Sequence, residues 1–137
     1  MDLYLGRYST YIYAILRIVV GLLFLLHGTQ KLFGYPPMPA GMGGGGALSG
    51  LLLAAAIIEV ITGAMILVGL FTGLAAFIAS GEMAVAYFLA FQSKGFWPQT
   101  NGGGEPLVLC FLFLYMAARG SGIWSVDSLR GKGPNPI

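Results

Sequence analysis

Residues 16–37 read LRIVVGLLFLLHGTQKLFGYPP, and this stretch decides the fold class. A run of apolar side chains continues to His27, the single histidine of the chain. Gly34 and the Pro36-Pro37 pair then break the helical pattern. A helix needs roughly 20 mostly apolar residues to cross a bilayer. Together with the apolar residues before it, the stretch predicts a transmembrane helix over residues 11–33.

The composition of the whole chain agrees with a lipid environment. Of the 137 residues, 57% are hydrophobic and only 9% are charged, and the mean hydropathy is +0.82. Soluble domains carry about 25% charged residues, so this chain cannot cover its surface with polar side chains. A net charge of +2 without a run of Lys or Arg argues against nucleic acid as a partner. The lone Cys110 excludes an internal disulfide.

Three further apolar stretches follow the first. We predict spans over residues 47–69, 73–91 and 106–123, with residues 124–137 as a cytoplasmic tail. The expected fold is therefore all-α, an integral membrane four-helix bundle that forms a single domain over residues 1–137.

An even number of spans places both termini on one side of the membrane, here named the terminal side. The two long loops, GYPPMPAGMGGGG and QSKGFWPQTNGGG, share the opposite side, named the loop side. Basic residues are more numerous on the terminal side, and this bias predicts cytoplasmic termini in the cell (inner) membrane. The terminal side carries Arg7, Arg119, Arg130 and Lys132, and the loop side carries Lys31 and Lys94.

Three ionisable residues lie well inside the predicted spans: Arg17, Glu59 and Glu82. Each costs about 2.5–3.5 kcal/mol at a helix centre, so each needs a partner or a watery cavity. Measured from the terminal side, their depths are roughly 9, 15 and 13 Å. We therefore predict that they meet in one polar layer. A stripe of the first helix faces this layer and comprises Arg17, Gly21, Phe24, Gly28 and Lys31.

The chemistry of these residues leaves alternatives open. The polar layer either fixes helix packing as a buried ion pair, or binds a polar headgroup or relays protons. His27 suits the carbonyl of a quinone or a haem iron, and equally suits a hydrogen bond to backbone at the interface. Lys31 is typical of an interfacial anchor, and a catalytic group is the alternative. Trp97 and its neighbour Phe96 indicate either an aromatic belt or a stacking wall for a ring-shaped ligand.

Four motifs in order resemble the DoxX family of four-helix membrane proteins, which includes the small subunit of thiosulfate:quinone oxidoreductase. They are HGTQKLFG after a first span with an intramembrane arginine, E-x-x-x-G in the second span, FWPQTNGGGE before the fourth span, and GSGIWSVD after it. The resemblance covers residues 17–127. The matching positions are Arg17, His27, Gly28, Lys31, Gly34, Glu59, Trp97, Asn101, Glu105 and Asp127. The chain departs from the family in its glycine-rich first loop and in the extra glycine of NGGGE.

The resemblance implies a quinone-interacting subunit of a membrane oxidoreductase complex. A proton or charge role then falls to Arg17, Glu59 and Glu82, and quinone binding falls to His27, Lys31, Trp97, Asn101 and Glu105. The chain has no flavin fingerprint, metal motif or haem motif, so partner redox subunits must supply the electrons. The alternatives are a non-catalytic accessory or assembly subunit and a small transporter or proton conductor. Homo- and hetero-oligomers are both compatible with the sequence.

Overall fold

The computed structural model describes residues 2–37 and 50–130, and every regular element in these ranges is a helix. The predicted all-α fold is confirmed. Four helices are long, and the rest are single turns that connect or extend them. The long helices are α2 (Ser9–Phe33), α3 (Gly50–Val68), α4 (Thr72–Ala86) and α6 (Gly104–Arg119). The short elements are α1 (Asp2–Leu5), η1 (Gly6–Tyr8), η2 (Tyr87–Phe91), η3 (Gln92–Lys94), α5 (Pro98–Asn101) and α7 (Val126–Leu129).

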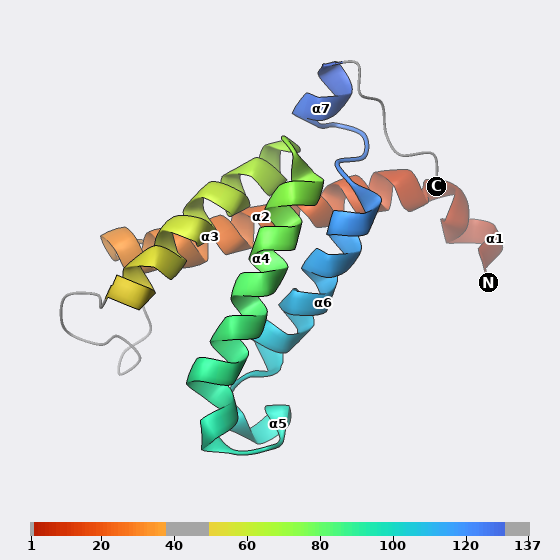
Figure 1. Ribbon diagram of the computed structural model, residues 1–137. Coiled ribbons are helices and arrows are strands. Elements are labelled where there is room, and N and C mark those ends of the chain that lie inside the picture. The colour runs from red at the N-terminus through yellow and green to blue at the C-terminus, as the bar shows by residue number, and fades with distance from the viewer. Residues whose placement is uncertain (1, 38–49, 131–137) are drawn as a thin grey trace.

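The long helices form two antiparallel pairs (Figure 1). α2 packs along α3, and α4 packs along α6. A tight turn over residues 69–71 joins α3 to α4, so the pairs meet at the terminal side and diverge from it. The α6 C-terminus returns to this same end, near the first half of α2.

Three helical segments are long and apolar enough to cross a membrane among the described residues. They cover Gly6–Phe33, Gly50–Val68 and Thr72–Lys94. The third continues from α4 through the π-helical turn η2 to Lys94. The chain is therefore a membrane protein with a bilayer as its environment.

The predicted fourth span is wrong at its C-terminal end. α6 stops at Arg119 because Gly120 takes a positive φ of 87° and leaves the helix. With 16 residues, α6 is about 24 Å long, shorter than the roughly 30 Å of a bilayer core. The residues after Gly120 instead fold back against α2 and the α3–α4 turn.

Small residues bring α2 and α3 into close contact. A Cβ added at Gly63 would lie 2.6 Å from the Leu25 backbone nitrogen, and one at Gly21 would lie 2.5 Å from that of Leu67. A Cβ at Gly28 would lie 2.8 Å from the Val60 nitrogen. The predicted glycine stripe of α2 therefore faces α3, and its glycines allow the two backbones to approach.

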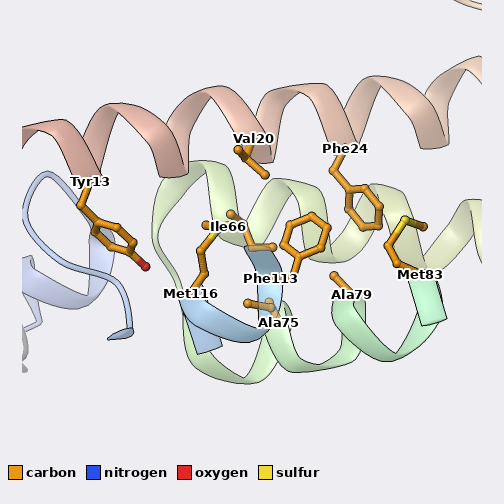
Figure 2. Packing of buried hydrophobic residues seen from close by; sticks show 10 residues of the cluster. Tyr13, Val20, Phe24, Ile66, Ala75, Ala79, Met83, Phe113 and Met116 are labelled. Atoms are coloured by element: carbon orange, nitrogen blue, oxygen red, sulfur yellow. The ribbon is translucent and has the colours of Figure 1, made fainter. Parts of the chain in front are cut away.

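A compact apolar layer joins the two helix pairs (Figure 2). The Phe24 and Phe113 rings lie 4.7 Å apart between centroids, and Met83 and Ala79 complete the contact from α4. Ile66 and Met116 extend the layer toward the terminal side. This layer separates two polar clusters, one at each side of the molecule.

Candidate functional site

The terminal-side cluster is built around Arg17, whose side chain is completely buried. Its guanidinium donates hydrogen bonds only to backbone carbonyls among its described partners. The acceptors are the carbonyl oxygens of Ile66, Ser121, Ile123 and Trp124. Four carbonyl dipoles can solvate a guanidinium without a counter-carboxylate, and they also fix the position of the segment that supplies them.

The segment over residues 120–130, here named the C-terminal segment, has further anchors. The Tyr13 hydroxyl donates to the Gly120 carbonyl at 2.6 Å. The Asp127 carboxylate accepts from the Phe71 backbone N–H at 2.9 Å and from the Ser121 hydroxyl at 2.6 Å. Arg17 therefore belongs to a structural joint that ties this segment to α2 and to the α3–α4 turn.

This arrangement corrects the predicted single polar layer. The α3 carbonyl that binds Arg17 belongs to Ile66, seven residues beyond Glu59. That separation is roughly 10 Å along the helix axis. Arg17 therefore lies in the terminal-side cluster, whereas Glu59 and Glu82 lie in a second cluster nearer the loop side.

The second cluster begins with an ion pair between α2 and α3. The Lys31 ammonium lies 2.7 Å from Oε1 of Glu59. The Glu59 side chain is 1% exposed, and that of Lys31 is 27% exposed. The Glu82 carboxyl on α4 is partly buried and interacts electrostatically with both Glu59 and Lys31. Glu59 therefore holds the ammonium group of Lys31, and the Glu82 carboxyl lies near this pair.

A contact between two ionisable side chains connects α2 to α6. His27 Nε2 lies 3.1 Å from Oε1 of Glu105, and the two side chains are 45% and 63% exposed. His27 precedes Lys31 by four residues, so the two lie one above the other on the same face of α2. We name the set of His27, Lys31, Glu59, Glu82 and Glu105 the loop-side polar cluster; all four long helices contribute to it.

Two buried oxygens in this cluster have no hydrogen-bond partner within the described part of the chain. They are Oε2 of Glu59 and Oε2 of Glu82. An unsatisfied buried carboxylate oxygen is costly, so such a site favours a proton or a ligand that can donate to it. The cluster thus combines hydrogen-bond donors with free acceptors at the loop-side ends of the helices.

Comparisons with known proteins agree with this architecture. The family model described as DoxX matches residues 12–92, more than half of the chain. The chain belongs to the DoxX family. A Haemophilus influenzae relative described as an uncharacterized protein is 43% identical over 127 residues, covering 90% of this chain and 94% of its own length. No solved structure matches the chain.

The DoxX match contains four of the five residues of the loop-side polar cluster, and Glu105 follows it on α6. Trp97 and Asn101 also lie beyond the match and outside the cluster's ion pairs. Trp97 is 64% exposed and packs edge-to-face on Phe96. The binding roles of Trp97 and Asn101 remain predictions, since their described contacts are with the loop and with η2.

Asn101 organises the loop before α6. Its side chain is 3% exposed and donates to the Gly95 carbonyl at 3.0 Å and to the Tyr87 hydroxyl at 3.3 Å. Its Oδ1 accepts from the Gly103 N–H at 2.7 Å. These contacts tie the loop to the π-helical turn η2, one turn beyond Glu82 on the same segment.

Sequence reasoning missed two features of this DoxX protein. The first is the role of the C-terminal segment, whose carbonyls bind Arg17. The glycines of its motif GSGIWSVD indicate a turn whose carbonyl groups are free to accept hydrogen bonds. The second is the Lys31–Glu59 pair. Its signal was present, because Lys31 shares the α2 stripe that faces α3, where Glu59 and Gly63 share a face.

Proposed function

We propose that this DoxX protein is the quinone-interacting subunit of a membrane oxidoreductase complex, with the headgroup bound at the loop-side polar cluster. The observation that supports this most is the pairing of donors with buried free acceptors. His27 and Lys31 can donate hydrogen bonds, and the unpartnered oxygens of Glu59 and Glu82 can accept them.

The residues of the cluster fit the chemistry of a quinone. A quinone presents two carbonyl acceptors and takes up two electrons and two protons when it is reduced. His27 suits a carbonyl acceptor because imidazole can donate a hydrogen bond or a proton. Lys31 can stabilise negative charge that develops on a headgroup oxygen. Glu82 and Glu59 can hold and release protons beside it. In this proposal Arg17 acts only as the structural anchor of the C-terminal segment.

The electrons must come from another chain. The sequence carries no flavin, iron–sulfur or haem motif, so partner redox subunits belong to the proposal. The excess of basic residues on the terminal side orients that side toward the cytoplasm of the inner membrane. The quinone site then lies toward the outer leaflet.

The first experiment measures quinone binding directly. The full chain, purified in a mild detergent, is titrated with a short-chain ubiquinone analogue, and co-purifying redox subunits are identified. We expect binding that weakens about tenfold in His27→Phe and in Lys31→Met, corresponding to a lost hydrogen bond of about 1.4 kcal/mol. Lys94→Gln is the matched control, because Lys94 is an exposed loop-side cation whose described contact is the Phe91 ring.

One observation favours a second candidate, a non-catalytic accessory or assembly subunit. The Lys31–Glu59 pair joins α2 to α3 and can serve packing alone. Absence of quinone binding in several mild detergents and in nanodiscs, together with folded variants, would contradict the quinone proposal. Co-purification with membrane proteins that carry no redox centre would then support the accessory role.

A further inference from the structure

We infer that the buried carboxyls Glu59 and Glu82 exchange protons with the loop side only, through His27 and Glu105. This inference deepens the proposed function, on which it rests for the use of the proton. It names the side of the membrane from which a bound headgroup takes up or releases its protons.

The net charge of Lys31, Glu59 and Glu82 requires that one of the two carboxyls hold a proton. Lys31 is paired with Glu59, Glu82 lies near this pair, and each carboxyl has an unpartnered buried oxygen. Glu59 is 1% exposed, so water does not compensate a second negative charge there. A buried carboxyl without a counter-charge is stable when it holds a proton. One proton shared by the two carboxyls neutralises the group of three residues.

The way to the terminal side is closed by an apolar layer and a fixed positive charge. Phe24, Ile66 and Phe113 are at most 2% exposed and fill the space between the helix pairs (Figure 2). Beyond them lies Arg17, which is completely buried and bound to four carbonyls. An arginine held at such a depth repels protons and other cations.

On the loop side, the ionisable side chains of His27 and Glu105 are exposed rather than buried. Glu105 is 63% exposed and contacts His27 at 3.1 Å, and His27 lies one helical turn from Lys31. In the inferred route, a proton taken up by the Glu105–His27 pair passes to Glu82 or Glu59 through intervening water. Each transfer moves one proton and no electrons, and the imidazole returns to its starting state when it next accepts a proton from Glu105 or from water.

The exchange can be timed by infrared spectroscopy without quinone. The full chain is reconstituted in lipid, and the C=O stretch of the protonated carboxyl is assigned with Glu59→Gln and Glu82→Gln. Transfer into D2O then shifts this band at the exchange rate. We expect His27→Gln to slow the exchange by about a hundredfold, the low end of what a positioned proton-transfer group contributes. Glu105→Gln should slow it in the same direction, and Lys94→Gln should leave it unchanged.

Two results would overturn the inference. One is a wild-type spectrum in which neither glutamine variant removes a protonated-carboxyl band. The other is an exchange rate in folded His27→Gln and Glu105→Gln equal to that of the wild type. Both histidine and glutamate positions are exposed, so these variants are expected to fold.

A separate experiment tests whether protons reach the buried carboxyls from one side of the membrane only. Liposomes that contain the wild-type chain and a lumenal pH dye should show no proton flux above that of empty liposomes, since the terminal side is closed. Clear flux through the wild-type chain contradicts one-sided access. Neither experiment uses quinone, so a failure to bind quinone would leave the exchange data interpretable.

Discussion

At the scale of single residues, the two side chains of the Lys31–Glu59 pair differ strongly in their exposure. The carboxylate is 1% exposed, whereas the lysine is 27% exposed. A lysine that loses its partner can extend its ammonium group toward the interface, but a buried glutamate cannot reach water. The two members of the pair should therefore differ in what their removal costs.

We predict that Lys31→Met lowers the free energy of unfolding by about 3 kcal/mol, the low end for breaking a buried pair from one side. Glu59→Gln should cost less, because the remaining cation can relocate. The double variant Lys31→Met/Glu59→Gln should recover most of the loss. Denaturant titration in detergent micelles measures all three, and equal losses in the two single variants would argue against the asymmetry.

At the scale of elements, the contact between α2 and α3 depends on glycine. Gly63→Ala places a Cβ 2.6 Å from the Leu25 backbone nitrogen, so the helices must separate. We expect it to destabilise the protein by about 1–3 kcal/mol. Gly81 is the matched control, because it lies inside α4 with nothing within 4 Å of an added Cβ. Gly81→Ala should stabilise the helix by up to about 1 kcal/mol.

The comparison is made by thermal unfolding of both variants in the same detergent. We expect Gly63→Ala to lower the stability and Gly81→Ala to raise it. An effect common to every glycine-to-alanine substitution therefore cannot produce the difference between them. A Gly63→Ala protein as stable as Gly81→Ala would contradict close packing at the α2–α3 contact.

The C-terminal segment depends on Gly69 in the α3–α4 turn. Gly69 has φ +77°, and a Cβ there would overlap the Cβ of Ser125 and approach the Arg17 guanidinium. We predict that Gly69→Ala displaces the segment and increases tryptic cleavage at Arg119 and Arg130 in proteoliposomes. Gly6→Ala, which has nothing within 4 Å of the new Cβ, serves as control. Equal cleavage in both variants would show that the segment is not held by this joint.

At the scale of the whole molecule, the helical fold could be predicted because it follows from composition and span length. The α2 stripe was also predictable, since glycines and Lys31 recur on one helical face. The partner of Arg17 was not. The position of a residue along its helix predicts how deep its charge lies in the membrane. It does not predict whether a side chain or a loop carbonyl will be its hydrogen-bond partner. The carbonyls that bind Arg17 come mainly from the C-terminal segment, which periodicity cannot place.

The two sides of the molecule hold their buried charged groups in different ways. On the terminal side, Arg17 donates its hydrogen bonds to four backbone carbonyls, while Oδ1 of Asp127 is buried without a hydrogen-bond partner among the described residues. The loop side keeps two buried carboxylate oxygens without partners beneath exposed His27 and Glu105. Unsatisfied buried polar groups are costly for stability, and on the loop side two such oxygens, those of Glu59 and Glu82, lie in one cluster.

Photo-crosslinking with an azido-quinone tests this account most directly. The purified chain is irradiated with the probe, digested, and mapped by mass spectrometry, with excess unlabelled quinone as competitor. We predict competable labelling of the α2 region around residues 27–31 and of the start of α6 near Glu105, lost in Lys31→Met and retained in Lys94→Gln. Labelling confined to the lipid-facing surfaces or to the C-terminal segment, and insensitive to competitor, would contradict a quinone site at the loop-side polar cluster.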